Sequence, residues 1–195
     1  MVNFIFFTDE KIFTVAAPTN SQNDRLGTRK KAVDEKRLVR TRLTFCKSVM
    51  VSVGVSKLGC TAREYYRNNL LGQKLLPDMC QLSQDEYFVF QQDGAPAHRA
   101  RDIITFLERQ TPNFIPPTLW PLNLPDLNPV DYSIWSVLQE KVYRSKITDV
   151  DELKTRLIDE WAQFDQSIID AAISQWRRRL SACVRERGAH FEHKF

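Results

Sequence analysis

Two apolar segments that carry aspartates constrain the fold of this chain more than any other feature. Residues 3–13 and 87–92 are rich in β-branched and aromatic side chains, which is typical of buried strands. Asp9 lies inside the first segment, and Asp93 directly follows the second, where Gly94 ends the strand pattern. Because a buried carboxylate is costly unless it is paired, we expect each aspartate to have a partner.

A third aspartate, Asp131, follows Asp93 with 37 residues between the two. If Asp9, Asp93 and Asp131 converge, they form an oxygen-only site that suits a hard divalent cation such as Mg²⁺. Proteins usually hold this ion with few carboxylates plus substrate phosphates. Such a site is typical of phosphodiester cleavage and transfer.

Each aspartate also has a purely structural interpretation. Asp9 could end a strand at the surface, Asp93 could start an Asp-Gly turn, and Asp131 could stabilise a helix N-terminus by about 0.3–1 kcal/mol. Taken singly, each is better explained by structure, whereas in their sequence context the three favour a shared site. We assign supporting roles near this site to the residues His98, Glu10 and Asn128.

Strand and helix patterns alternate along the chain, which is typical of an α/β domain. They predict strands at about 3–8, 44–55, 87–92 and 114–115, and helices at about 62–82, 98–110, 149–163 and 166–187. A further helix is expected to begin at Pro129, with Asn128 as its N-cap and Asp131 in its first turn. Thr148 is the expected N-cap of the helix at 149–163.

Basic residues are clustered, although the net charge of +4 is mild. Eight of them lie between positions 25 and 42: Arg25, Arg29, Lys30, Lys31, Lys36, Arg37, Arg40 and Arg42. Arg177 and Arg178 lie beside Trp176 in the last predicted helix, where they could form a solvated face or meet phosphate. Both groups are candidate contacts to a nucleic-acid backbone.

A chain of 195 residues is long enough for one domain with a full hydrophobic core, so we expect a single domain over residues 1–195. No apolar run is long enough to span a membrane. The four cysteines lack the spacing of a zinc site or a disulfide framework. We therefore expect an intracellular chain with reduced thiols and no membrane contact.

Three motifs resemble those of the mariner-superfamily transposases: Phe7–Lys11, Gln91–His98 and Pro125–Trp135. The chain is similar to the branch of that superfamily whose catalytic domain carries three aspartates, with 37 residues between the second and the third. The resemblance implies an RNase H-like fold, with a mixed central sheet and helices on both of its faces. It also implies metal-dependent cleavage and strand transfer of DNA, with two Mg²⁺ ions per site or Mn²⁺ in their place.

The same resemblance assigns the catalytic and metal-binding roles to Asp9, Asp93 and Asp131, and not to Asp126. It implies that the partners are transposon and target DNA, that the chain works in the nucleus, and that it could form a homodimer.

The chain also departs from the family pattern. Only eight residues precede Asp9, which leaves no room for the helix-turn-helix modules that read transposon ends, so we expect a truncated copy. After Gly59 the sequence passes almost directly into a helical pattern, so the sheet is expected to lack or shorten one strand. The alternative function is a non-catalytic remnant that binds DNA or another partner.

Overall fold

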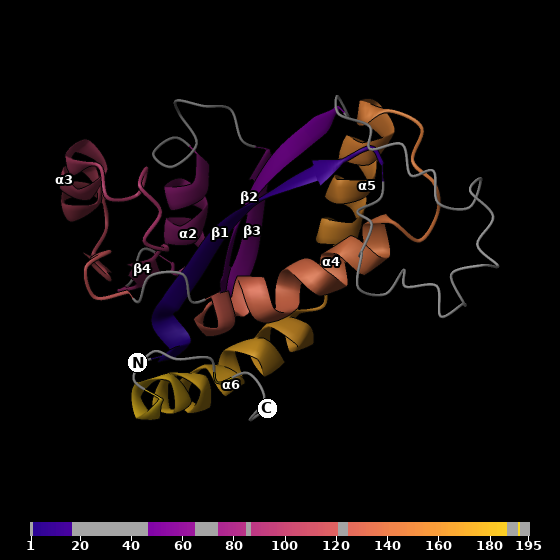
Figure 1. The fold of residues 1–195 in the computed structure, drawn as a ribbon. Coiled ribbons are helices and arrows are strands. Elements are labelled where there is room, and N and C mark those ends of the chain that lie inside the picture. Colours follow the sequence, from indigo (N-terminus) through magenta and orange to yellow (C-terminus); the bar gives the residue numbers. More distant parts are fainter. Residues whose placement is uncertain are drawn as a thin grey trace, which may run out of the picture.

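The structure is a computed structural model that describes residues 2–16, 47–64, 74–84, 87–120, 125–186 and 191. In these residues a five-stranded mixed sheet has the strand order β3-β2-β1-β4-β5 (Figure 1). Strands β1 to β3 are antiparallel neighbours, whereas β4 and β5 run parallel to β1. The strands are β1 (Ile5–Thr14), β2 (Ser48–Ser56), β3 (Gly59–Glu64), β4 (Val89–Gln91) and β5 (Asn113–Phe114).

Strand β3 shows that the expected loss of a strand is wrong. It pairs with β2 from Ser56 opposite Gly59 to Val51 opposite Glu64. The reversal between the strands is tight, and Gly59 has a φ of +145°, a conformation that favours glycine. The short turn places the third strand where the sequence pattern predicted only the approach to a helix.

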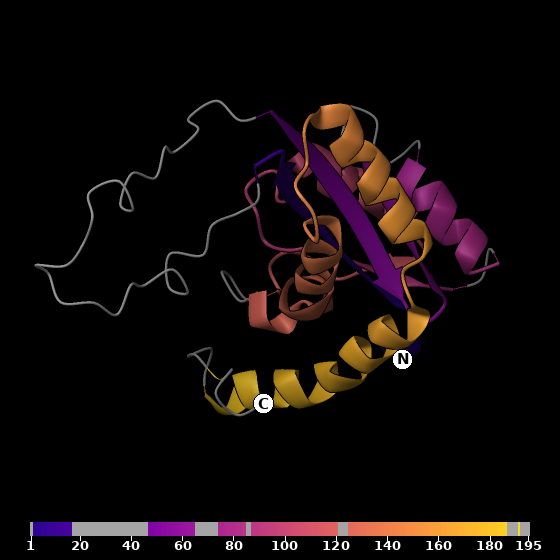
Figure 2. The ribbon, with the colours of Figure 1, turned by 90° about the vertical axis from the view of Figure 1, so that its right-hand side faces the viewer.

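Helices cover both faces of the sheet, as Figures 1 and 2 show together. The helix expected at 62–82 is only partly described. Residues 62–64 belong to β3, residues 65–73 lie outside the described ranges, and α2 lies in the remaining part. The other predicted helices are confirmed with shifted ends. The helices are α2 (Leu76–Leu82), α3 (Arg101–Gln110), α4 (Trp135–Val142), α5 (Val150–Ala162) and α6 (Gln166–Arg185).

The side chains of β1 alternate between two hydrophobic cores because successive residues of a strand point to opposite faces. Ile5 and Phe7 pack into the larger core, with α4, α5 and α6. Phe6 packs into the smaller core, with α2 and α3. Burial on both faces explains why this segment reads as a continuous apolar run.

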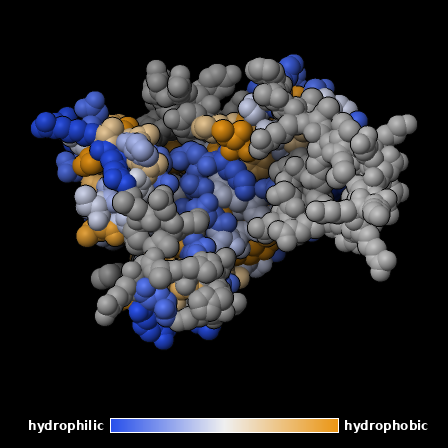
Figure 3. Space-filling view, in the orientation of Figure 1, coloured by the Kyte–Doolittle hydropathy of each residue, from blue (hydrophilic) through white to orange (hydrophobic). Residues whose placement is uncertain are grey.

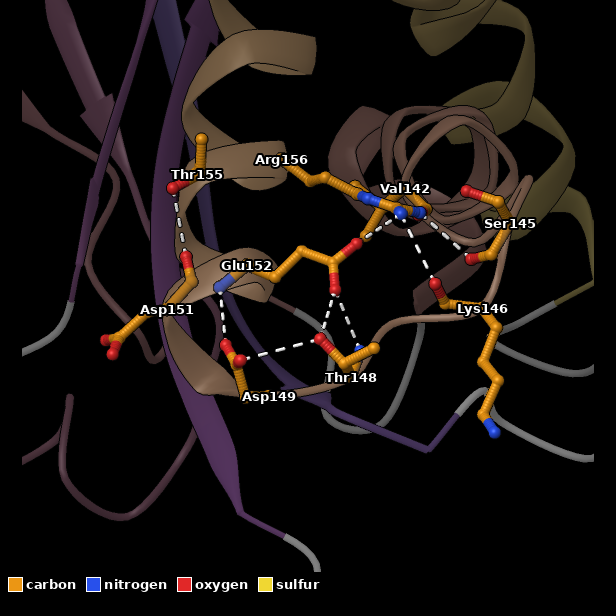
Figure 4. Close-up of polar contacts among 9 residues, drawn as sticks. All are labelled: Val142, Ser145, Lys146, Thr148, Asp149, Asp151, Glu152, Thr155 and Arg156. Carbon is orange, nitrogen blue, oxygen red and sulfur yellow. Dashed lines mark hydrogen bonds and ion pairs between the residues drawn. The ribbon is translucent and has the colours of Figure 1, made fainter.

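The connection between α4 and α5 is fastened by Arg156 (Figure 4). Its guanidinium donates to the backbone carbonyls of Val142, Ser145 and Lys146. Asp149, and not Thr148 as predicted, caps α5, because its Oδ1 accepts a hydrogen bond from the amide of Glu152. This cap and the Arg156 contacts hold α5 against the end of α4.

Hydrophilic side chains gather over the middle of the face that Figure 3 shows. Among the described helices, none has the length and apolar character that a membrane crossing requires. Among the described residues, Cys60, Cys80 and Cys183 form no disulfide bond.

Candidate active site

The parallel pairing of β1 with β4 brings Asp9, in the middle of β1, and Asp93, just beyond the end of β4, to the same part of the sheet. Phe7 of β1 lies opposite Gln91 of β4 in the parallel register. The Thr8 hydroxyl also donates a hydrogen bond of 2.6 Å to the carbonyl oxygen of Gln91. Asp9 and Asp93 each follow this pair by two residues, so the register aligns the two carboxylates.

Asn128 attaches the segment of Asp131 to β1. Its Nδ2 donates to the carbonyl oxygen of Thr8 over 3.0 Å, and its Oδ1 accepts from the amide of Val130 over 3.1 Å. Asn128 is 1% exposed, so both bonds are shielded from water. The predicted capping role is confirmed, and the same side chain fixes the helix start next to Asp9.

Asp131 lies on a π-helical turn, Val130–Ile134, that precedes α4. A regular α-helical turn was expected from Pro129. The short 3₁₀ turn Pro125–Leu127 and this π turn replace it. Wide turns of this kind are uncommon and are often found at functional sites.

Asp9 is the centre of the carboxylate cluster. Its Oδ2 accepts a hydrogen bond of 2.5 Å from the indole nitrogen of Trp135. Asp131 is also close enough to interact with Asp9, because the charge of Asp9 raises the pKa of Asp131.

His98 connects Asp93 to the strand that carries Asp9. Its Nδ1 lies 2.6 Å from Oδ1 of Asp93, and its Nε2 lies 3.5 Å from Oε2 of Glu10. The amide of Ala95 also donates to Oδ1 of Asp93 over 3.0 Å, and the Ser52 hydroxyl donates to Glu10 over 3.2 Å. His98 therefore bridges Asp93 and Glu10, and the supporting roles of His98 and Glu10 stay predictions.

The electrostatics of Asp9 and Asp131 show that the cluster is crowded with negative charge. Burial raises the pKa of Asp131 to about 8, helped by the charge and hydrogen bond of Asp9 and by the charge of Asp93. Burial also raises the pKa of Asp9. The ammonium of Lys11 partly opposes this effect by lowering the pKa of Asp131.

Asp93 differs from the other two aspartates. The hydrogen bond from His98 lowers its pKa, and the amide of Ala95 and the charge of Arg99 act in the same direction. Burial lowers the pKa of His98, but its contacts with Asp93 and Glu10 outweigh burial and raise it. The pKa shifts of the cluster thus run in opposite directions, raised for Asp9 and Asp131 and lowered for Asp93.

The donor set fits a divalent cation by its chemistry. Within the described ranges, no three side chains of His, Cys, Asp or Glu are already close enough together to hold a metal ion. The charge of Asp93 nevertheless raises the pKa of both Asp9 and Asp131, and the charge of Asp9 raises the pKa of Asp131. A cation among them would oppose these shifts, because an opposite charge favours the ionised form.

Of the predicted DNA-binding residues, the structure places only Arg177 and Arg178, which are exposed on α6. Their neighbours pack inward: the Trp176 ring lies 5.4 Å from that of Phe7, and the Arg179 guanidinium lies 3.8 Å from the centre of the Tyr132 ring. The basic residues from 25 to 42 lie outside the described ranges.

Sequence reasoning missed two residues of the site. Trp135 was assigned only to the apolar face of a helix, although its indole reaches Asp9. Lys11 was only part of a motif, although its charge acts on both Asp9 and Asp131. Trp135 follows Asp131 by four residues, a spacing that puts two residues on one side of a helix and could have indicated the contact.

A family comparison assigns the chain to a known group. Residues 5–154 match the family described as DDE superfamily endonuclease. The chain belongs to this family. All three aspartates of the candidate site lie within the matched residues of this DDE superfamily member.

The curated relatives of this DDE-family chain are transposases. Over 194 residues it is 25% identical to the Transposable element Tc3 transposase of Caenorhabditis elegans, a match that covers 94% of this chain and 56% of the relative. Over 101 residues it is 28% identical to the Tcb2 transposase of Caenorhabditis briggsae, covering 52% of this chain and 36% of the relative. The chain therefore spans about a third to just over half of these relatives.

Solved structures show the same fold. The catalytic domain of Mos1 mariner transposase matches with a TM-score of 0.69 and 20% identity, covering 98% of this chain and 85% of that one. The Mos1 Strand Transfer Complex matches with a TM-score of 0.75 and 21% identity, covering 98% of this chain and 56% of that one. The RNase H-like fold and the resemblance to mariner-type catalytic domains are confirmed.

Proposed function

We propose that this chain is the catalytic domain of a cut-and-paste DNA transposase that cleaves and transfers phosphodiester bonds with divalent metal ions. The observation that carries the proposal is that Asp9 and Asp93 each lie two residues beyond a directly opposed pair of the parallel strands β1 and β4, while Asn128 attaches the segment of Asp131 to β1. Membership of the DDE superfamily endonucleases supports it. The solved structures that resemble this chain include the Mos1 transposase catalytic domain with Mg and with Mn.

Asp9, Asp93 and Asp131 would hold the metal, with two Mg²⁺ ions, or Mn²⁺ in their place, at each site. When bound, the ions would activate the attacking oxygen and offset negative charge at the scissile phosphate. A bound cation would favour the ionised forms of Asp9 and Asp131, whose pKa values burial raises. His98 keeps Asp93 oriented, and Asn128 keeps Asp131 next to β1.

DNA would approach through phosphate contacts that carry no sequence information. Arg177 and Arg178 are exposed on α6, and we propose these two residues and the basic residues from 25 to 42 as the phosphate contacts. We also propose a nuclear location, because the substrate is DNA. A homodimer remains a prediction that sedimentation of the chain with and without DNA would test.

Nicking of supercoiled plasmid tests the proposal. The wild-type chain should convert plasmid to the open-circular form in Mn²⁺ and not in EDTA. Asp93→Asn, which keeps the side-chain volume but removes a charge, should not nick. If the wild-type chain binds DNA but never nicks it in Mg²⁺ or in Mn²⁺, a non-catalytic remnant is the better account of this chain.

A further inference from the structure

Trp135 contacts the carboxylate cluster through a polar atom and not only through its ring. Its Nε1 lies 2.5 Å from Oδ2 of Asp9, and the residue is 2% exposed. Water therefore does not compete for the indole N–H. Hydrogen bonds to an ionised acceptor are stronger than those between neutral groups, so this contact holds one oxygen of Asp9 in place.

The indole is itself held in orientation. The Phe13 ring packs against it edge-on, with ring centres 5.9 Å apart. Lys11 Nζ lies 5.9 Å from the centre of the Trp135 ring, on its face. These neighbours, both on β1, keep the N–H directed at Asp9.

Trp135 and Asp131 both reach Asp9 from the same segment. Asp131 lies on the π turn that leads directly into α4, and Trp135 is the first residue of α4. Farther along, the Tyr143 hydroxyl donates to the carbonyl of Thr14 over 2.6 Å. The Asp9–Trp135 contact and the Tyr143 bond thus fasten α4 to β1 at the first residue of the helix and just beyond its last.

We propose that Trp135 is a positioning residue of the metal site. Its indole N–H occupies Oδ2 of Asp9 and leaves the other oxygen for Asp131 and a divalent cation. Groups that orient metal ligands from the second layer typically change metal affinity by about 10–100-fold when they are mutated. The inference rests on the proposed function, because the cation belongs to that proposal.

Trp176 provides a matched control. Its ring also packs against a β1 residue, at 5.4 Å from the Phe7 ring, but its buried Nε1 has no hydrogen-bond partner among the described residues. Trp176→Phe therefore removes an indole from the same side of the sheet without removing a contact to a carboxylate. If Trp135 only fills space, Trp135→Phe and Trp176→Phe should have similar effects.

The test is a titration of the whole chain with Mn²⁺, in which free Mn²⁺ is measured by electron paramagnetic resonance. Trp135→Phe should raise the Kd for Mn²⁺ by about 10–100-fold, whereas Trp176→Phe should leave it close to that of the wild type. Replacement of Trp135 by 3-benzothienylalanine, which keeps the shape but lacks the N–H, should act like Trp135→Phe. Circular dichroism would confirm that each variant is folded.

A spectroscopic measurement separates positioning from packing. In a chain labelled with ¹⁵N-tryptophan, the indole resonance of Trp135 should shift when Mg²⁺ is added, and that of Trp176 should not. Wild-type affinity in the benzothienylalanine variant would overturn the inference and leave the proposed function intact. A wild-type chain that binds no Mn²⁺ would contradict the metal site and the inference together.

Discussion

Replacing Asp131 by Asn should make the metal-free fold more stable at neutral and alkaline pH. The pKa of Asp131 is raised from 3.8 to about 8, so the folded chain keeps a proton that the unfolded chain releases. Stability is therefore lost as pH rises through this window. An asparagine amide can still donate a hydrogen bond to Asp9 but has no proton to lose.

The size of the effect follows from linkage. A single proton held only by the folded state lowers the free energy of unfolding by about 1.4 kcal/mol for each pH unit. Between pH 5 and pH 7, Asp131→Asn should therefore gain up to about 2.7 kcal/mol relative to wild type. Because Asp9 and Asp131 titrate as a pair, part of the gain could appear through Asp9.

Urea unfolding in EDTA, followed by circular dichroism at several pH values, measures this difference. The stability curves of wild type and Asp131→Asn should diverge as pH rises, and Mg²⁺ at pH 8 should stabilise the wild type more than the variant. Curves that stay parallel from pH 5 to pH 8 would mean that Asp131 ionises normally, and the account of the cluster would be wrong.

Three further predictions concern the frame of the site and its DNA contacts. Tyr143→Phe leaves the amide and carbonyl of Thr14 without their partner and should cost about 1–3 kcal/mol in urea unfolding. Arg156→Met removes the donor to three carbonyls and should cost a similar amount, about 1–3 kcal/mol, in the same assay. Arg177→Ala should weaken binding to any duplex and reduce the slope of log affinity against log salt by about 0.9, with exposed Arg109→Ala on α3 as the control; an unchanged slope would remove Arg177 from the DNA contacts.

Asp9 and Asp93 could each be placed on or just after a strand from the sequence, because local patterns identify both strands. Asp9 lies inside one buried apolar run and Asp93 directly follows the other, whereas the parallel pairing of the two runs is seen only in the structure. The position of Asp131 was predictable for a different reason: Asn128 and Pro129 mark a helix start. The π turn was not predictable, since it depends on the bonds that Asn128 makes to β1.

Strand β3 was missed because its sequence is a weak strand pattern and its turn is short. Gly59 looked like the end of one strand, whereas it begins the next. What favours a strand here is pairing with β2, a contact that no local pattern reports. Trp135 was missed for a related reason, since an aromatic residue on a helix face reads as core until its N–H is seen to meet Asp9.

The central claim is that Asp131, on its rigid turn, serves the reaction and that Asp126, five residues earlier in the same motif, does not. Its most direct test is the rate of supercoiled-plasmid nicking in Mn²⁺ by Asp131→Asn and Asp126→Asn beside wild type. The account predicts that Asp131→Asn abolishes nicking, even though it folds at least as stably, and that Asp126→Asn retains most of it. Loss of nicking in Asp126→Asn with activity preserved in Asp131→Asn would contradict the account.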